Sequence, residues 1–209
     1  MSGGGAGHWD AVYGARAEAA LTWFEADPAL SLRLIAAHAG PDAPVIDVGA
    51  GASRLVDALL ARGYGRLTCL DLSAAALGVA QARLGAAAAR VSWVVADVTA
   101  WAPEPGAYAV WHDRAAFHFL TDAAARRAYL SRMAAALRPG GHAILMTFAE
   151  DGPEMCSGLP VQRWSPAALA AEVEAQVPGA FAPVASERHL HHTPKGGAQG
   201  FQASVFRRL

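Results

Sequence analysis

Hydrophobic and polar positions alternate between two patterns through the middle of the chain. Short apolar runs, each typical of a buried strand, occur at 45–48, 66–70, 91–95, 108–111 and 142–148. The stretches between them have the spacing and the capping residues of helices, as in Ser53–Arg62, Ser73–Leu84 and the segment opened by Thr121 and Asp122. This alternation predicts an open parallel sheet with helices on both faces.

The two ends of the chain follow other patterns. Helical patterns cover Asp10–Glu25, Pro28–Ala39 and Ser165–Val177. Two strand-like stretches, Val184–His191 and Gln199–Phe206, are joined by the turn-rich loop Thr193–Gly197, which predicts a hairpin. Leu137 precedes the expected turn Arg138–Gly141, which leads into the fifth strand. We therefore expect a single α/β domain over residues 1–209.

Composition and charge exclude several classes of protein. A chain of 209 residues can bury a core without disulfides or a metal, and two cysteines are too few for a disulfide framework. The 17 basic and 18 acidic residues form no basic patch, so no stable nucleic acid binding is expected. Without a signal peptide or a long apolar run, we expect a cytoplasmic protein with no membrane partner.

Residues capable of binding a ligand follow four of the predicted strands. The first strand runs through Asp47 into a loop with Gly49, Ala50 and Gly51, and the second and third strands end at Asp71 and Asp97. The fourth strand is followed by His112, Asp113 and Arg114. Ligands of such sheets bind at the carboxyl ends of the strands, where glycines allow close approach and an acid suits a ribose.

Two kinds of cofactor fit this layout. A dinucleotide calls for Gly-x-Gly-x-x-Gly, but Arg54 occupies the third glycine position and Asp47 would repel a diphosphate. S-adenosylmethionine carries a sulfonium, an ammonium and a ribose, and these groups match the carboxylates of Asp47, Asp71 and Asp97.

The motifs Val45–Gly51, Leu70–Ser73, Val95–Val98 and Leu137–Gly141 together resemble the class I S-adenosylmethionine-dependent methyltransferase family, over about residues 8–150. The resemblance implies a Rossmann-like, seven-stranded, mostly parallel sheet with helices on both faces and a C-terminal antiparallel β-hairpin. It further implies an N-terminal helical lid (1–40), a cofactor-binding core (41–150) and a substrate-side loop, helix and hairpin (151–209). Ser53 departs from the pattern, because many members have a third glycine there.

The resemblance also implies roles for single residues. Gly49, Ala50 and Gly51 would contact the methionine and ribose parts of the cofactor, with Asp47 close by. Asp71 would bind the ribose hydroxyls, and Asp97 the adenine amino group, with Leu72 and Val98 flanking the ring. Trp9 and Tyr13 resemble a Trp-Asp-x-x-Tyr lid that would close over the methionine end; a simple aromatic staple of the first helix is the alternative.

The acceptor side is less defined. Asp113 and Arg114 resemble the Asp-Arg-Gly of thiopurine-type methyltransferases and the Asp-Lys-Gly of protein-lysine methyltransferases. We expect Asp113, His112 and His118 to be the candidate catalytic bases, with Asp113 also touching the cofactor. Arg114 and Cys156 are the candidate substrate contacts. His118 could instead be a packed core histidine, and Cys156 an inert small residue.

These features predict an enzyme that methylates a nucleophilic acceptor. A small molecule is favoured, with a thiol or another soft nucleophile possible, because nothing in the chain provides a charged docking surface. A protein-lysine methyltransferase and a non-catalytic nucleotide-cofactor-binding protein are the alternatives. His189, His191 and His192 lack partners for a metal site, and no metal is expected. The oligomeric state stays open.

Overall fold

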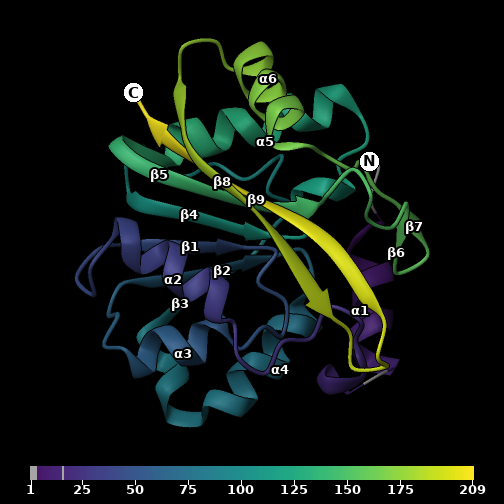
Figure 1. Ribbon diagram of the computed structural model, residues 1–209. Coiled ribbons are helices and arrows are strands. Elements are labelled where there is room, and N and C mark those ends of the chain that lie inside the picture. The colour runs from purple at the N-terminus through teal and green to yellow at the C-terminus, as the bar shows by residue number, and fades with distance from the viewer. Residues whose placement is uncertain (1–3, 16) are drawn as a thin grey trace.

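The fold is built around one seven-stranded sheet with the strand order β3-β2-β1-β4-β5-β9-β8. A computed structural model describes residues 4–15 and 17–209, and Figure 1 shows its ribbon. The strands are β1 (Val45–Val48), β2 (Leu67–Asp71), β3 (Val91–Val95), β4 (Tyr108–Arg114), β5 (Leu137–Phe148), β8 (Phe181–His192) and β9 (Ala198–Arg208).

Strands β1 to β5 are parallel, whereas β9 pairs antiparallel with both β5 and β8. The sheet order reverses beside β1, which has β2 on one side and β4 on the other. That reversal opens a crevice at the carboxyl ends of β1 and β4, the usual ligand position in open α/β sheets. The seven-stranded sheet and its C-terminal antiparallel hairpin confirm the predicted fold.

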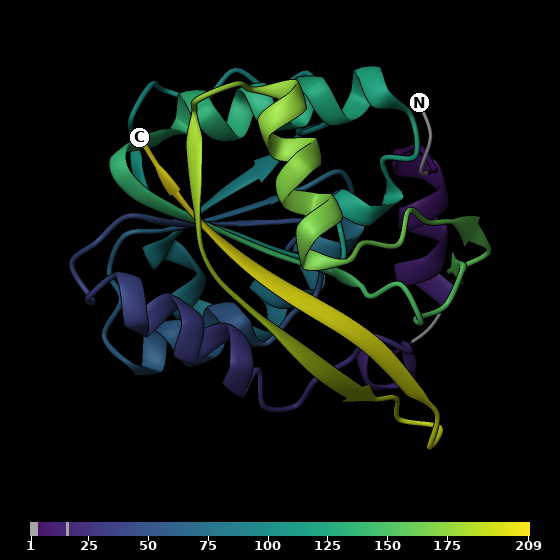
Figure 2. The same cartoon turned by 45° about the horizontal axis from the view of Figure 1, so that its top comes forward.

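Helices cover both faces of the sheet and make a three-layer structure (Figures 1 and 2). One face carries α2 (Ala29–His38), α3 (Leu55–Ala61) and α4 (Ala74–Leu84), and the other carries α5 (Ala123–Ala136) and α6 (Pro166–Gln176). Ser73, Asp122 and Ser165 accept hydrogen bonds from the first backbone N–H groups of α4, α5 and α6. These caps explain why the three helices begin where the sequence predicts.

The core consists of two apolar layers, one on each side of the sheet. All residues of β1 and β2 are buried, as expected for central strands of a parallel sheet. Ile35 and Leu59 pack on one face, and Tyr129 and Met133 on the other, all of them almost fully buried. This packing holds the carboxyl ends of the strands in fixed positions.

The N-terminal part differs from the predicted helix over Asp10–Glu25. Helix α1 (Ala6–Ala15) ends early and is followed by the 3₁₀ turn η1 (Glu18–Ala20) and irregular chain. Glu18 forms ion pairs with Arg54 and Arg83, which draw this segment onto the glycine loop instead of letting the helix continue.

Smaller differences occur elsewhere. The expected turn at Arg138–Gly141 lies within β5 as an irregularity, because β4 pairs first with Leu137 and next with His142. Two short strands, β6 (Met155–Cys156) and β7 (Leu159–Pro160), form a separate hairpin that the sequence did not predict. The remaining 3₁₀ turns are η2 (Gly85–Arg90) and η3 (Phe117–Phe119).

Within residues 4–15 and 17–209, none of the helices has the length and apolarity needed to cross a bilayer.

Candidate functional site

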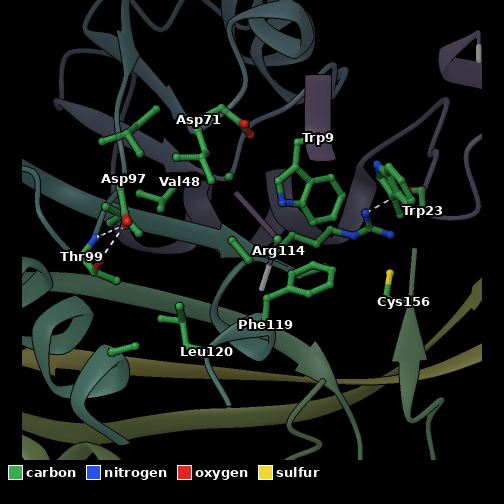
Figure 3. Close-up of a pocket in the computed structure, with 18 of the residues that line it drawn as sticks. Trp9, Trp23, Val48, Asp71, Asp97, Thr99, Arg114, Phe119, Leu120 and Cys156 are labelled. Carbon is green, nitrogen blue, oxygen red and sulfur yellow. Dashed lines mark hydrogen bonds between the residues drawn. The ribbon is translucent and has the colours of Figure 1, made fainter. Parts of the chain in front are cut away.

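A cavity of about 170 Å³ lies at the carboxyl ends of β1, β2 and β4. Figure 3 shows that its wall has two parts. We call the part with Asp71, Leu72, Asp97 and Val98 the acidic half. The other part, the aromatic half, is lined by Trp9, Trp23, Phe119, Phe148, Cys156 and Phe201.

Asp71, in the acidic half, is oriented by two hydrogen bonds from backbone N–H groups. Its Oδ1 accepts a hydrogen bond from the backbone N–H of Ser73, and its Oδ2 accepts one from Gly51, each at 2.8 Å. A carboxylate has about four acceptor positions, so both oxygens keep capacity for further donors. Burial raises the pKa of Asp71 to about 6, against the lowering effect of these two N–H groups.

Asp97 lies farther along the acidic half, between Ala96 and Val98 on the cavity wall. Its Oδ1 accepts hydrogen bonds from the backbone N–H and the hydroxyl of Thr99, at 2.9 and 2.7 Å (Figure 3). These two donors fix the side chain through its Oδ1. Leu72 and Val98 add apolar surface to the acidic half of the cavity.

The glycine loop separates this cavity from a smaller one lined by Asp47, Ala50, Arg54 and His112, among others. Gly49, Tyr13, Trp23 and Arg114 line both cavities. Gly49 and Gly51 have φ angles of 67° and 53°, the left-handed region that favours glycine. A Cβ on Gly51 would also collide with the hydroxyl of Tyr13. The loop therefore has to be glycine for the first helix to lie this close.

Helix α1 places the aromatic rings of Trp9 and Tyr13 over the cavity. Trp9 packs edge-on against Phe119, with ring centroids 5.0 Å apart, and Trp23 lies 6.1 Å from both Trp9 and Tyr13. Asp10 ties the helix down, because its Oδ1 accepts from the Ser73 hydroxyl at 2.6 Å. The structure thus places both predicted lid aromatics on the wall of the site.

Arg114 crosses the cavity beneath Trp9, and its guanidinium reaches Trp23 (Figure 3). Its NH1 donates to the carbonyl of Trp23 at 2.9 Å, and its NH2 donates to Glu25 Oε1 at 2.8 Å. Cys156 lines the same half of the cavity, and burial raises its pKa to about 11. The thiol is therefore protonated at neutral pH.

The expected bases His112 and Asp113 do not face the larger cavity. Because β4 continues to Arg114, these two residues lie inside the strand instead of in the loop after it, and their side chains point to opposite faces of the sheet. His112 is bonded through Nδ1 to Asp47 at 2.7 Å and through Nε2 to Ser31 at 2.9 Å, and it lines only the smaller cavity. The structure therefore places His112 on the smaller cavity and not in a loop after β4.

Asp113 is fully buried, and its hydrogen-bond donors are groups of the protein itself. Its carboxylate accepts from the backbone N–H groups of Ala116 and Phe117 and, at 2.5 Å, from the Tyr129 hydroxyl. Burial raises its pKa to about 6. These donors hold the loop after β4, and Asp113 does not line the larger cavity.

His118 is also buried and stays off the cavity wall. It packs against Phe119 and Phe148, and its Nδ1 accepts weakly from the backbone N–H of Phe148 at 3.4 Å. Burial lowers the pKa of His118 to about 3, with Arg114 contributing. The packed-histidine alternative fits this geometry, and the proposed catalytic role does not.

Sequence reasoning missed most of the aromatic half. Phe119, Phe148 and Phe201 come from three separate elements and Trp23 from the irregular chain before α2, and no local motif connects them. Ala115, which also lines the cavity, is the one of these residues beside a motif, because it occupies the place of the glycine in Asp-Arg-Gly. The structure gives Ala115 a φ angle of 68°, which a glycine would adopt without strain.

Comparisons with known proteins agree on one family. A family model described as a methyltransferase domain matches residues 45–141. The solved 1,6-didemethyltoxoflavin-N1-methyltransferase of Burkholderia thailandensis, with bound S-adenosylhomocysteine, is 27 % identical, with a TM-score of 0.68. That match covers 86 % of this chain and 77 % of the other. The matched domain and these structures support a class I S-adenosylmethionine-dependent methyltransferase.

Other structures share the fold of this methyltransferase. One, described as the conversion of a disulfide bond into a thioacetal group during echinomycin biosynthesis, is 21 % identical, has a TM-score of 0.74, and matches over 97 % of this chain and 92 % of its own. The N-methyltransferase NodS of Bradyrhizobium japonicum, with S-adenosylhomocysteine, is 17 % identical, with coverages of 86 % and 84 % and a TM-score of 0.64. The search of curated proteins finds no match.

In the part of the methyltransferase that the structure describes, no group of three His, Cys, Asp or Glu side chains could hold a metal ion. His191 instead bonds through Nε2 to the carbonyl of Thr22 at 2.8 Å, and its Nδ1 lies 3.3 Å from Glu25. His189 also lies near Glu25, at 3.7 Å. These contacts attach the C-terminal hairpin to the N-terminal segment beside the cavity.

The environment of Asp113 generates a stability prediction. Tyr129→Phe removes the hydroxyl that donates to Asp113 and accepts from the Trp111 indole at 2.8 Å, so it should lower the free energy of unfolding by about 1.5–3 kcal/mol. Urea denaturation measures this. Tyr108→Phe is the control, because it removes a hydroxyl bonded at 3.2 Å to neutral Thr68, and should cost about 1 kcal/mol or less. Equal losses would contradict a special role for the buried carboxylate.

Proposed function

We propose that this methyltransferase transfers the methyl group of S-adenosylmethionine to a small, largely apolar molecule with a thiol or another soft nucleophile. The observation that carries the proposal is the aromatic half of the cavity, whose walls are aromatic and apolar side chains with one cysteine. Such walls bind a compact organic molecule by excluding water from it.

The acidic half and the glycine loop would hold the cofactor. Asp71, oriented by Gly51 and Ser73, would accept hydrogen bonds from the ribose hydroxyls. Asp97 would take the adenine amino group, with Leu72 and Val98 beside the ring. Gly49, Ala50 and Asp47 would face the methionine part, under Trp9 and Tyr13. Residues 1–40 would then act as the lid, 41–150 as the cofactor core and 151–209 as the substrate side.

When bound, S-adenosylmethionine supplies an electrophilic methyl group on its sulfonium. The chain's own contribution is to align an acceptor lone pair with that methyl group, since orientation accounts for much of the rate of such displacements. Trp9, Trp23 and Phe119 would keep water out, and Arg114 and Cys156 would contact the acceptor. Cys156 would do so as a protonated thiol.

A protein-lysine acceptor is the second candidate, and the charges in the cavity favour it less. A lysine ammonium needs a group to take its proton and is helped by a nearby carboxylate. The carboxylates on the cavity wall are Asp71 and Asp97, both of them in the acidic half, whereas the charged group beside the aromatic half is the cation of Arg114. An extended peptide would also have to displace α1 from its contacts with α4.

The cofactor assignment can be tested at Asp71. Asp71→Asn should weaken S-adenosylmethionine binding by about ten- to a hundredfold, because the amide offers one acceptor oxygen in place of two. In the unchanged protein, affinity should fall as pH drops through about 6, because the acid with its raised pKa becomes protonated there. The variant should lose this pH dependence. Calorimetric titration measures both effects.

The exposed Asp42→Asn serves as the charge-matched control and should bind the cofactor as the unchanged protein does. Thermal unfolding of both variants separates a binding loss from misfolding. Unchanged affinity in a folded Asp71→Asn protein would contradict the ribose assignment.

The acceptor assignment can be tested at Phe119. Phe119→Ala should raise the KM for an aromatic thiol about tenfold or more, because it removes apolar surface from the aromatic half, and should leave cofactor affinity unchanged. Product formation is followed by mass spectrometry, with a lysine-rich peptide as the competing acceptor. Phe181→Ala is the control, since Phe181 is equally buried but lies away from the cavity. Methylation of the peptide alone would overturn the small-molecule proposal.

A further inference from the structure

Arg114 is the one positively charged side chain on the wall of the larger cavity, within the described part of the chain. Besides its bonds to Trp23 and Glu25, its guanidinium stacks on the ring of Phe201, 5.3 Å from the centroid. Its Nε is shielded from solvent and has no hydrogen-bond partner in the structure. Burial makes the charge of Arg114 costly, as the lowered pKa of this residue shows, and an anion bound in the cavity would offset that cost.

In the part of the chain that the structure describes, the aromatic half also lacks a group that could take a proton from the acceptor. Besides Arg114, the titratable side chains nearest to it on the cavity wall are Cys156 and Tyr13, and burial raises the pKa of each, so both stay protonated. His118 packs behind Phe119 and Phe148, with its pKa lowered to about 3. None of these groups can therefore act as a general base that removes a proton from the acceptor during methyl transfer.

We propose that the acceptor binds with its nucleophile already ionised, as a small organic anion such as an aromatic thiolate, and that the positive charge of the Arg114 guanidinium positions it. This inference rests on the proposed small-molecule acceptor. The proton is lost to water before binding. The sulfur lone pair then forms the bond to the methyl carbon as the sulfonium bond breaks, and the electron pair of that bond stays on S-adenosylhomocysteine. The anion and the sulfonium thus become two neutral thioethers.

The surroundings of Arg114 determine how the proposal is tested. Glu25 faces the guanidinium from the segment before α2, His191 from β8, Asp47 from β1 and Cys156 from β6. His189, also on β8, lies near Glu25. The negative charge of Glu25 competes with a bound anion for Arg114. Removing that charge should therefore strengthen anion binding, whereas removing the charge of Arg114 should weaken it.

The first experiment measures affinity without turnover. 4-Nitrothiophenolate and its neutral thioether, 4-nitrothioanisole, are titrated into the protein saturated with S-adenosylhomocysteine, at a pH where the thiol is ionised. The anion should bind about tenfold tighter or better. Equal or weaker binding of the anion would overturn the inference.

Variants of Arg114 and Glu25 identify the positioning group. Arg114→Gln should lose the preference for the anion and keep its affinity for the thioether, with Arg114→Lys restoring part of the preference. Glu25→Gln should increase the preference, although it breaks the same ion pair. A purely structural role would make both charge-removing variants weaker for both ligands. The double variant, with both charges removed, controls for the cost of leaving either group buried alone.

The second experiment measures kcat/KM against pH for 4-nitrothiophenol and the less acidic 4-methoxythiophenol. The rising limb should move with the pKa of each thiol. One limb shared by both thiols would show a base on the enzyme and overturn the inference. Transfer to no thiol, with the anion still preferred in the binding experiment, would instead contradict the proposed acceptor class and leave Arg114 as an anion site.

Discussion

The geometry of the site depends on one carboxylate and two backbone N–H groups. Asp71 ends β2, and its two oxygens accept from Gly51, in the loop after β1, and from Ser73, at the start of α4. These bonds join two loops that leave neighbouring strands at the switch point of the sheet. Burial makes the charge on Asp71 costly, as its raised pKa shows, and a ligand with two hydroxyl donors would offset that cost.

The same loops receive the N-terminal segment. Asp10 bonds to Ser73, Glu18 pairs with Arg54 and Arg83, and Glu25 pairs with Arg114. Each contact joins an acid of the segment to a residue beside the glycine loop or the end of β4. Exposed ion pairs contribute little, but these are half-buried and share partners, so the segment forms part of the wall of the cavity. The aromatic half of the cavity therefore depends on the N-terminal residues, which contribute Trp9 and Trp23 to its wall.

The sequence predicted the sheet and the acidic half well, since both depend on local signals. Apolar runs ending in glycine or aspartate identify strand ends, and parallel strands bring those ends together, so Asp71 and Asp97 could be placed without a structure. The aromatic half depends on tertiary packing. Phe119 and Phe201 lie far apart in the chain, and only the pairing of β5 with β9 brings the hairpin beside the site.

The sequence also placed His112 and Asp113 in a loop after the fourth strand, and this placement was wrong for a different reason. A polar pair after an apolar run was interpreted as a loop, but β4 continues through both residues, and strand alternation points them into the layers on either side. There Ser31 and Tyr129 satisfy their hydrogen bonds. Two polar residues at a strand end do not show whether the covering helices carry hydrogen-bond partners for them. Those partners, Ser31 and Tyr129, lie far from β4 in the sequence.

The most direct test of this account is calorimetric titration of the purified protein with S-adenosylmethionine, S-adenosylhomocysteine and NADH under one set of conditions. The account predicts that both sulfur compounds bind with one site per chain and that NADH does not compete with either. Binding of NADH in place of the sulfur compounds would contradict the assignment of the glycine loop and Asp71 to S-adenosylmethionine, and the proposed chemistry of the cavity would fail with it.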